Sequence, residues 1–222
     1  MKFLRRHLDW MSLKDRSYAF LFDKLGNEEV VSIDCETTGL NRKKDDIVSI
    51  AAIKIRGNRI LTSEAFRASV RPRTALAADS IKIHHILKSD VADERPIEAV
   101  LPDFLKFIGN RPLVGYWIDF DVAMLNKNVR EMLRISLQNP RIDVCDMYYD
   151  RKYGKAPPGT KIDLKFASIL EDLQLPPLQA HDAFNDALST AQMYLVLKDM
   201  TERGVRLVRT RENWAQPQTP IG

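Results

Sequence analysis

The sequence predicts an α/β fold in which helices flank one mixed, five-stranded sheet. Two observations support this expectation. Apolar, β-branched runs follow one another closely in the first third of the chain, and later runs alternate with segments whose apolar residues recur at helical spacing. The 222 residues are enough for one substantial core and leave little room for a second full domain. We therefore expect a single main domain.

The expected elements can be placed along the chain. Apolar runs bounded by turn residues predict strands at 30–36, 47–55, 59–70, 113–116 and 141–145. Helical spacing of apolar residues predicts helices at about 96–109, 120–134, 163–173 and 183–201. The turn at 56–59 joins two strands as a hairpin. We expect Asp119 to cap the second helix and residues 150–162 to form a basic loop.

Both ends of the chain differ in character from its middle. Residues 1–26 mix apolar side chains with charges and predict an N-terminal extension of one or two amphipathic helices. The main domain is then expected at 27–204, followed by a basic, mobile tail at 205–222. The apolar stripe of the extension either packs on the chain's own core, which we favour, or docks a partner protein.

Composition narrows the possible classes of protein. A net charge of +4 and a pI near 9.0 fit a polyanionic partner, although they are weak evidence alone. Cys35 and Cys145 lie in strand-like apolar segments without zinc-binding spacing, so we expect buried thiols. The N-terminus lacks the apolar core of a signal peptide, and no apolar run is long enough to span a membrane. We therefore expect a cytoplasmic protein that does not associate with membranes.

Four acidic residues and a histidine stand in distinctive local settings. Asp34 and Glu36 end an apolar strand two positions apart, so their side chains point to the same face and Cys35 points to the other. Asp121 begins one predicted helix and Asp186 another. Crowded carboxylates repel unless cations neutralise them, and hard oxygen ligands favour Mg²⁺ or Mn²⁺. The set therefore indicates a two-metal phosphodiester hydrolase.

Each of these residues also has a structural interpretation. An isolated Asp-x-Glu usually lies on a solvated strand edge, and an acid such as Asp121 often stabilises a helix N-terminus. The ordered occurrence of all the motifs favours the ligand interpretation. His181 precedes Asp186 by five positions, and imidazoles titrate close enough to neutral pH to act as general bases. Asp182 is expected to cap the last helix rather than bind metal.

The motifs together resemble a known family. Ile33-Asp34-Cys35-Glu36-Thr37-Thr38-Gly39-Leu40, Gly115 with Phe120-Asp121, and His181-x4-Asp186 resemble the three motifs of the DEDD exonucleases in the branch with a histidine (DEDDh, DnaQ-like). This branch is typified by the proofreading epsilon subunit of bacterial DNA polymerase III. Ile83-His84-His85-Ile86 is similar to a segment that members carry between the first two motifs. The resemblance covers about 27–203.

The resemblance implies a fold and an activity. It implies a ribonuclease H-like fold, two Mg²⁺ or Mn²⁺ ions, and release of nucleoside 5′-monophosphates from a 3′ end. The implied metal ligands are Asp34, Glu36, Asp121 and Asp186, with His181 as the general base. Thr37, Thr38, Gly39 and Leu40 are implied to lie beside the terminal nucleotide. His84 is expected either to contact the substrate or to fill a gap in the core.

Substrate and partners are left more open by the sequence. Tyr116-Trp117 stands where many relatives have His-Asn, which bears on substrate preference. We expect single-stranded DNA 3′ ends as the substrate. The alternatives are an RNA-trimming or oligoribonucleotide-degrading enzyme and a catalytically silent, polymerase-associated binding module. Residues 1–26 could dock a DNA polymerase or another protein. The basic segments 42–44, 151–155 and 161–165 are solvated faces or track a nucleic-acid strand.

Overall fold

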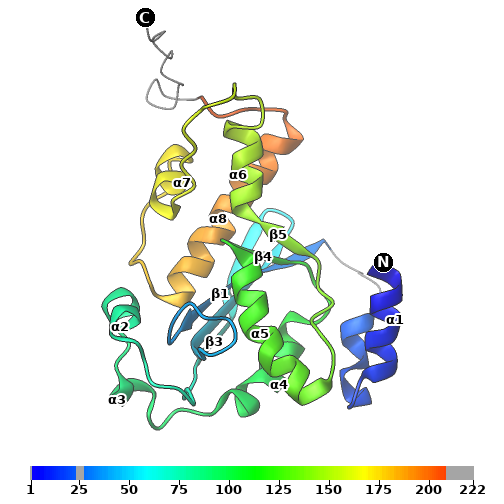
Figure 1. Cartoon of the computed structure of the whole chain (residues 1–222). Coiled ribbons are helices and arrows are strands. Elements are labelled where there is room, and N and C mark those ends of the chain that lie inside the picture. The colour runs from blue at the N-terminus through cyan, green and yellow to red at the C-terminus, as the bar shows by residue number, and fades with distance from the viewer. Residues whose placement is uncertain (1, 24–27, 209–222) are drawn as a thin grey trace, which may run out of the picture.

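A mixed five-stranded sheet forms the centre of the structure, a computed structural model that describes residues 2–23 and 28–208 (Figure 1). Its strands are β1 (Glu29–Thr37), β2 (Ile47–Arg56), β3 (Arg59–Ser69), β4 (Leu113–Gly115) and β5 (Arg141–Asp143), in the order β3-β2-β1-β4-β5. The pairs β1–β2 and β2–β3 are antiparallel, whereas β1–β4 and β4–β5 are parallel. The predicted mixed sheet is therefore confirmed.

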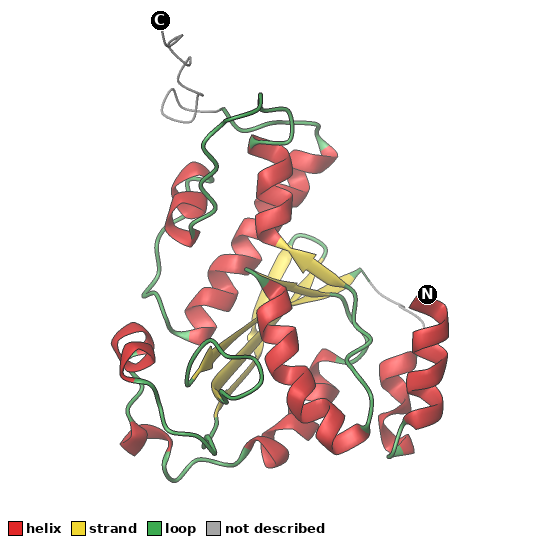
Figure 2. Ribbon diagram, in the orientation of Figure 1, coloured by secondary structure: helices red, strands yellow, loops and turns green. Residues whose placement is uncertain are grey.

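Helices cover both faces of this sheet (Figure 2). On one face lie α4 (Ile97–Ile108) and α5 (Ile118–Leu133), which pack against Val31, Ile33 and Cys35 of β1. On the other face α8 (Ala183–Glu202) crosses β1 and β2, with α6 (Val144–Lys152) and α7 (Phe166–Asp172) beside it. Successive residues of β1 alternate between these two layers, as the pleat of a strand requires.

The N-terminal segment shares the core of the main domain. It forms α1 (Lys2–Ser12) and the 3₁₀ helix η1 (Arg16–Phe22), which confirms the predicted helices. Leu13 and Leu21 are buried in the cluster that α4 and α5 form with the sheet, and the Lys14 N–H donates to the Leu133 carbonyl at 3.1 Å. Three apolar side chains of α1 stay exposed, namely those of Leu4, Leu8 and Met11. The division of the chain at residue 26 stays a prediction.

The structure corrects two expectations about helix boundaries. Helix α5 begins at Ile118 with Trp117 as its N-cap, so Asp119 is not the cap; its carboxylate instead pairs with Arg141 at 2.6 Å. Cys145 is buried as expected but lies in a helix, because β5 ends at Asp143 and α6 begins at once. An apolar run of a few residues does not distinguish a strand end from a buried helix start.

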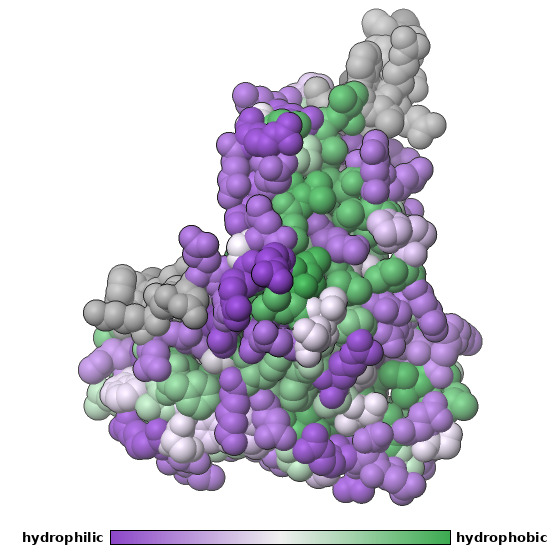
Figure 3. Space-filling view, turned by 180° about the vertical axis from the view of Figure 1, so that it is seen from behind, coloured by the Kyte–Doolittle hydropathy of each residue, from purple (hydrophilic) through white to green (hydrophobic). Residues whose placement is uncertain are grey.

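Further elements were not predicted. Two short helices, α2 (Ala78–His84) and α3 (Lys88–Val91), and the whole of α6 lie where no helix was expected. The expectations for residues 24–26 and for most of the tail (209–222) lie outside the described residues. Among the described helices none has the length and apolar character that crossing a membrane requires. From behind, hydrophobic residues show as a band up the middle of the molecule between hydrophilic flanks (Figure 3).

Candidate active site

Three carboxylates from distant parts of the chain meet at the end of β1. Asp34 and Glu36 lie on the face of β1 that α8 covers, and Asp186 lies in the first turn of α8. Their ligand oxygens all lie within 4.8 Å of one another. Oxygen donors at this spacing have the chemistry and proximity to hold a divalent cation. The sequence predicted the Asp34–Glu36 pair from strand geometry, and the fold brings Asp186 to it.

Small residues allow α8 to approach the sheet so closely. Ala183 and Ala187 are buried against Ala51 and Ile53 of β2, and the Ser32 hydroxyl donates to the Ala187 carbonyl at 2.8 Å. The helix begins where its Asp182 carboxylate accepts the Asn185 N–H at 2.9 Å, which confirms the predicted cap. Asp186, one turn further on, is thereby fixed beside β1.

The fourth acid, Asp121, approaches from the opposite layer. Strand β4 ends at Gly115, and within residues 2–23 and 28–208 no further strand pairs with this edge of β1 beyond it. The buried Asp121 carboxylate accepts the Cys35 N–H there at 3.0 Å, which satisfies a backbone donor that would otherwise lack a partner. Gly115 makes the turn possible, since a Cβ on it would lie 2.6 Å from the Ile118 Cδ1. Asp121 is thus adjacent to the three clustered carboxylates but hydrogen-bonded to backbone.

Burial and mutual repulsion shift the titration of these acids. Burial, reinforced by the charges of Asp121 and Glu36, raises the pKa of Asp34 well above its usual range. Burial first, then Asp186 and Asp182, raises the pKa of Glu36 to about 7. Burial also raises the pKa of Asp121 to about 8 and raises that of Asp186. A site that disfavours its own negative charges is stabilised by bound cations.

His181 lies at the rim of the acidic cluster. Its backbone N–H donates to the Asp186 Oδ2 at 2.9 Å, while its side chain is exposed. The backbone has a φ of 60°, a left-handed conformation that is uncommon for a residue other than glycine. The structure therefore fixes the backbone of His181 against Asp186 and leaves its side chain exposed at the rim of the cluster.

The loop after Glu36 is organised largely by internal hydrogen bonds. The Thr37 hydroxyl donates to the Gly39 carbonyl, and the Thr38 hydroxyl accepts the Asp46 N–H, so both side chains are buried. Leu40 is 83% exposed at the loop tip. Of the four residues expected beside the terminal nucleotide, Leu40 is thus the one whose side chain is largely exposed to solvent and open to contact with a ligand.

Asp46 has a structural role that the sequence did not reveal. Its Oδ2 accepts the N–H groups of Arg73 and Thr74, at 3.0 and 2.8 Å. Its Oδ1 pairs with Lys127 at 2.7 Å. This one carboxylate therefore ties the loop after β1 to the segment after β3 and to α5. In the sequence, the one sign of this role is that Asp46 directly precedes the buried strand β2.

The His84 side chain packs beneath the loop that follows Glu36, next to the Thr37 carbonyl. The Ile86 N–H donates to its Nδ1 at 3.0 Å, so Nδ1 is unprotonated and the Nε2–H faces the Thr37 carbonyl at 3.2 Å. Burial lowers the pKa of His84, which favours this neutral form. The side chain is buried. Filling a gap beneath Thr37 is what the structure describes, and a contact of His84 with substrate stays a prediction.

Tyr116 and Trp117 connect the site to the basic loop between α6 and α7. The Tyr116 hydroxyl donates to the Leu164 carbonyl at 3.0 Å, and its ring packs edge-on against Phe166. Trp117 has a φ of 53° and remains 50% exposed, and its backbone N–H donates to the Asp143 carboxylate at 3.3 Å. An exposed indole four residues before Asp121 offers a flat surface near the acids.

The sequence matches a family model and several curated proteins. A model described as Exonuclease (RNase_T) matches residues 31–194. The epsilon subunit of DNA polymerase III from Aquifex aeolicus is 29% identical over 173 residues, which cover 78% of this chain and 82% of that protein. The PolC-type DNA polymerase III of Thermotoga maritima is also 29% identical, over 80% of this chain but 12% of its own length. The chain thus spans about an eighth of these PolC-type relatives.

Solved structures share the fold at low sequence identity. Exonuclease I of E. coli in complex with a dT13 oligonucleotide superposes with a TM-score of 0.66 and 16% identity, over 80% of this chain and 42% of that one. Cell-death related nuclease 4 (CRN-4) gives a TM-score of 0.65 and 15% identity, over 82% of this chain and 66% of that one. The predicted ribonuclease H-like fold is confirmed.

Proposed function

The chain belongs to the exonuclease family, and from this premise we propose that it is a metal-dependent 3′→5′ exonuclease that releases nucleoside 5′-monophosphates from single-stranded DNA. The observation that carries the proposal is the convergence of Asp34, Glu36 and Asp186 within 4.8 Å. Relatives named as polymerase III proteins, and a structural neighbour solved with a DNA oligonucleotide, favour DNA as the substrate.

The donor set fits two Mg²⁺ or Mn²⁺ ions. Asp34, Glu36 and Asp186 would hold them, with Asp121 contributing the carboxylate oxygen that does not accept the Cys35 N–H. All of these donors are carboxylate oxygens, the type that Mg²⁺ and Mn²⁺ prefer. Bound divalent ions supply Lewis acidity, activating a water and stabilising the leaving oxygen of an in-line displacement.

The chain's own residues then bind the strand and move a proton. His181 accepts the proton of the attacking water, and the hydrogen bond from its backbone N–H to Asp186 fixes the loop that carries it. The exposed Leu40 packs against the terminal nucleotide, while Thr37 and Thr38 hold the loop backbone in place beneath it. Asp182 remains a helix cap that adds to the negative potential of the site.

A substrate panel tests the proposal directly. Purified protein is incubated with matched 5′-labelled DNA and RNA oligomers with Mg²⁺, with Mn²⁺ and with EDTA. We expect stepwise shortening of DNA from the 3′ end that requires metal, and loss of this activity in Asp34→Asn but not in Asp93→Asn, an exposed acid. Faster consumption of RNA would overturn the DNA preference. Equal turnover by wild type and Asp34→Asn would locate the activity elsewhere.

We also propose that the N-terminal segment contacts a DNA polymerase. The relatives named as polymerase III proteins support this, as do Leu4, Leu8 and Met11, whose apolar side chains are exposed on α1. The test is co-elution of the full chain with the purified polymerase catalytic subunit of the same organism. Substituting Leu8→Gln and Met11→Gln together should abolish co-elution and leave the exonuclease activity intact. Unchanged co-elution would refute this docking surface.

A further inference from the structure

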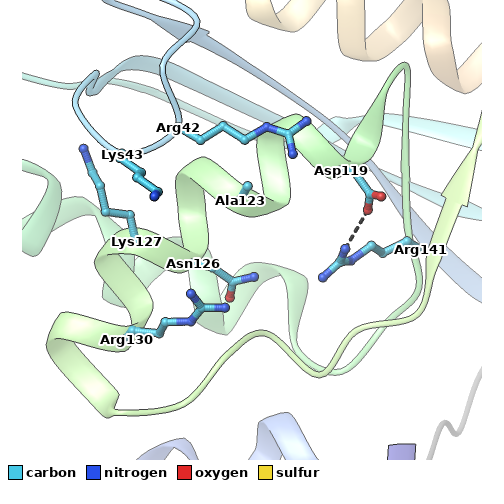
Figure 4. A pocket seen from close by; sticks show the side chains of 8 residues that line it. All are labelled: Arg42, Lys43, Asp119, Ala123, Asn126, Lys127, Arg130 and Arg141. Carbon is cyan, nitrogen blue, oxygen red and sulfur yellow. Dashed lines mark hydrogen bonds and ion pairs between the residues drawn. The ribbon is translucent and has the colours of Figure 1, made fainter.

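A basic pocket lies on the outward face of α5, separate from the acidic cluster. It encloses about 540 Å³. Its lining comes from the loop after β1, from α5 and from the start of β5, and Figure 4 shows these side chains around the cavity: Arg42, Lys43, Asp119, Ala123, Asn126, Lys127, Arg130 and Arg141. Five of the eight lining residues are cationic, and one is acidic.

Not all of these cations are neutralised by the protein. Arg141 pairs with Asp119 at 2.6 Å and Lys127 with Asp46 at 2.7 Å, so these two charges are compensated. The remaining three, Arg42, Lys43 and Arg130, form no ion pair with any carboxylate in the described part of the chain. The Arg130 Nε donates to the neutral Ser136 hydroxyl at 3.0 Å. The pocket thus keeps an excess of positive charge.

Apart from Asp119, whose carboxylate is paired with Arg141, the polar side chains that line the pocket are donors. The Asn126 side chain is buried, and its Oδ1 accepts the Leu137 N–H at 2.7 Å, so its amide nitrogen is the end directed to the cavity (Figure 4). Guanidinium groups present planar sets of N–H donors that match phosphate oxygens. A cavity lined by ammonium, guanidinium and amide donors selects an anion, and phosphate is the anion that this geometry suits.

The pocket is also close to the candidate active site. Asp121 points inward from α5, whereas its neighbours Asp119 and Ala123 lie on the pocket side of the same helix. The Arg42 guanidinium lies 5.7 Å from the centre of the Phe120 ring, and Phe120 directly precedes Asp121 in the sequence. Only five residues of chain separate Glu36 from Arg42. A polymer with one end at the acids can therefore reach the pocket around the first turn of α5.

We propose that this pocket binds backbone phosphates of the nucleic-acid substrate, at phosphodiesters remote from the scissile 3′ end. The inference rests on the proposed exonuclease function, because it assigns the pocket to the same substrate. Binding here is independent of base sequence, since phosphate contacts position a strand without reading it. The pocket gives longer strands an affinity advantage over short ones, which lack phosphates to fill it.

Binding measurements under non-cleaving conditions test the assignment. Fluorescence anisotropy in EDTA compares wild type with Arg130→Gln and with Arg42→Gln/Arg130→Gln. For an oligothymidylate of about 20 nucleotides we expect roughly 3- to 10-fold weaker binding per substitution, and a salt dependence whose slope falls by about 0.7 per lost cation. Arg59→Gln is the matched control, because Arg59 is exposed at the β2–β3 turn, outside the pocket. Thermal unfolding verifies that all variants fold.

Three outcomes would overturn the proposal. The first is wild-type affinity and salt slope in the double variant. The second is an equal loss of affinity in Arg59→Gln, which would indicate a general charge effect. The third is a double variant that binds the oligonucleotide like wild type but no longer binds inorganic phosphate or a mononucleotide. That result would identify the pocket as a site for a small anion. A separate assay tests the exonuclease proposal itself. If the wild-type protein does not shorten a trinucleotide in the presence of Mg²⁺, the exonuclease proposal fails independently of the pocket.

Discussion

Replacing Glu36 by glutamine should stabilise the metal-free protein, although Glu36 is a proposed metal ligand. The carboxylate is crowded by Asp186 and Asp182 and largely removed from water, and its pKa is raised from 4.5 to about 7. A carboxyl with a raised pKa in the folded state binds protons more tightly there than in the unfolded chain. Its ionisation therefore lowers the free energy of unfolding as pH rises from about 4.5 to about 7.

The magnitude follows from the size of the shift. Each pKa unit corresponds to about 1.4 kcal/mol, so the ionised Glu36 side chain costs about 3 kcal/mol at pH 8. At pH 5 most of this cost is absent, because the folded protein keeps the proton, and the difference falls to about 1 kcal/mol. For a chain of this length the gain at pH 8 corresponds to a rise in Tm of roughly 6–12 °C.

The assay is thermal or urea unfolding in EDTA, at several pH values between 5 and 8. Glu36→Gln is compared with wild type and with Glu171→Gln, a control whose carboxylate is exposed at the end of α7. We expect a stabilisation that grows with pH in Glu36→Gln alone. Adding Mg²⁺ should raise the Tm of wild type more than that of the variant. A variant that is less stable at pH 8, or a pH-independent difference, would refute the electrostatic reasoning.

Three further predictions concern other parts of the structure. His181→Asn should lower kcat by roughly 10²- to 10⁴-fold and leave the Tm unchanged, since asparagine tolerates the φ of 60° and keeps the backbone N–H; single-turnover kinetics and unfolding measure both. Glu29→Gln should cost about 2 kcal/mol at pH 7 in urea unfolding, because the hydrogen bond from Arg111 first, and then Arg56, holds the pKa of the buried Glu29 below its usual value. That contribution is present above about pH 4.5 and is lost as pH falls through the lowered folded pKa, so equal costs at pH 7 and pH 3 would contradict it. Gly115→Ala should cost about 1–3 kcal/mol, since its Cβ would lie 2.6 Å from the Ile118 Cδ1; an unchanged Tm would show that this turn relaxes freely.

Local pattern was sufficient for most of the secondary structure and for part of the site. The strands at 30–36, 47–55 and 59–70 follow from apolar runs and turn residues, and the structure has them within two residues. The convergence of Asp34 and Glu36 follows from the two-residue period of a strand. The capping role of Asp182 follows from the helical pattern behind it. These features depend on residues a few positions apart.

Competition between local signals explains the failures. Asp119 has the chemistry of an N-cap, but its carboxylate pairs with Arg141, 22 positions away. The helix begins earlier, at Ile118, with Trp117 as its N-cap. The apolar pair Val144-Cys145 suits a strand or a helix, and in the structure both residues are buried at the start of α6, which packs against α8. Asp46 gave no sign of its hydrogen bonds to residues 73 and 74, which come from another strand connection.

The sequence by itself determined the residue types of the candidate site, their order and the family to which the chain belongs. Only the tertiary structure decided how the site is assembled and how it titrates. Asp186 joins the acids of β1 because Ala183 and Ala187 let α8 lie close to the sheet, and burial then raises the pKa values of the cluster. The basic pocket has the same origin, since Arg42 and Arg130 meet only after folding. Spacing along a chain specifies local geometry, whereas desolvation and charge proximity depend on contacts between distant segments.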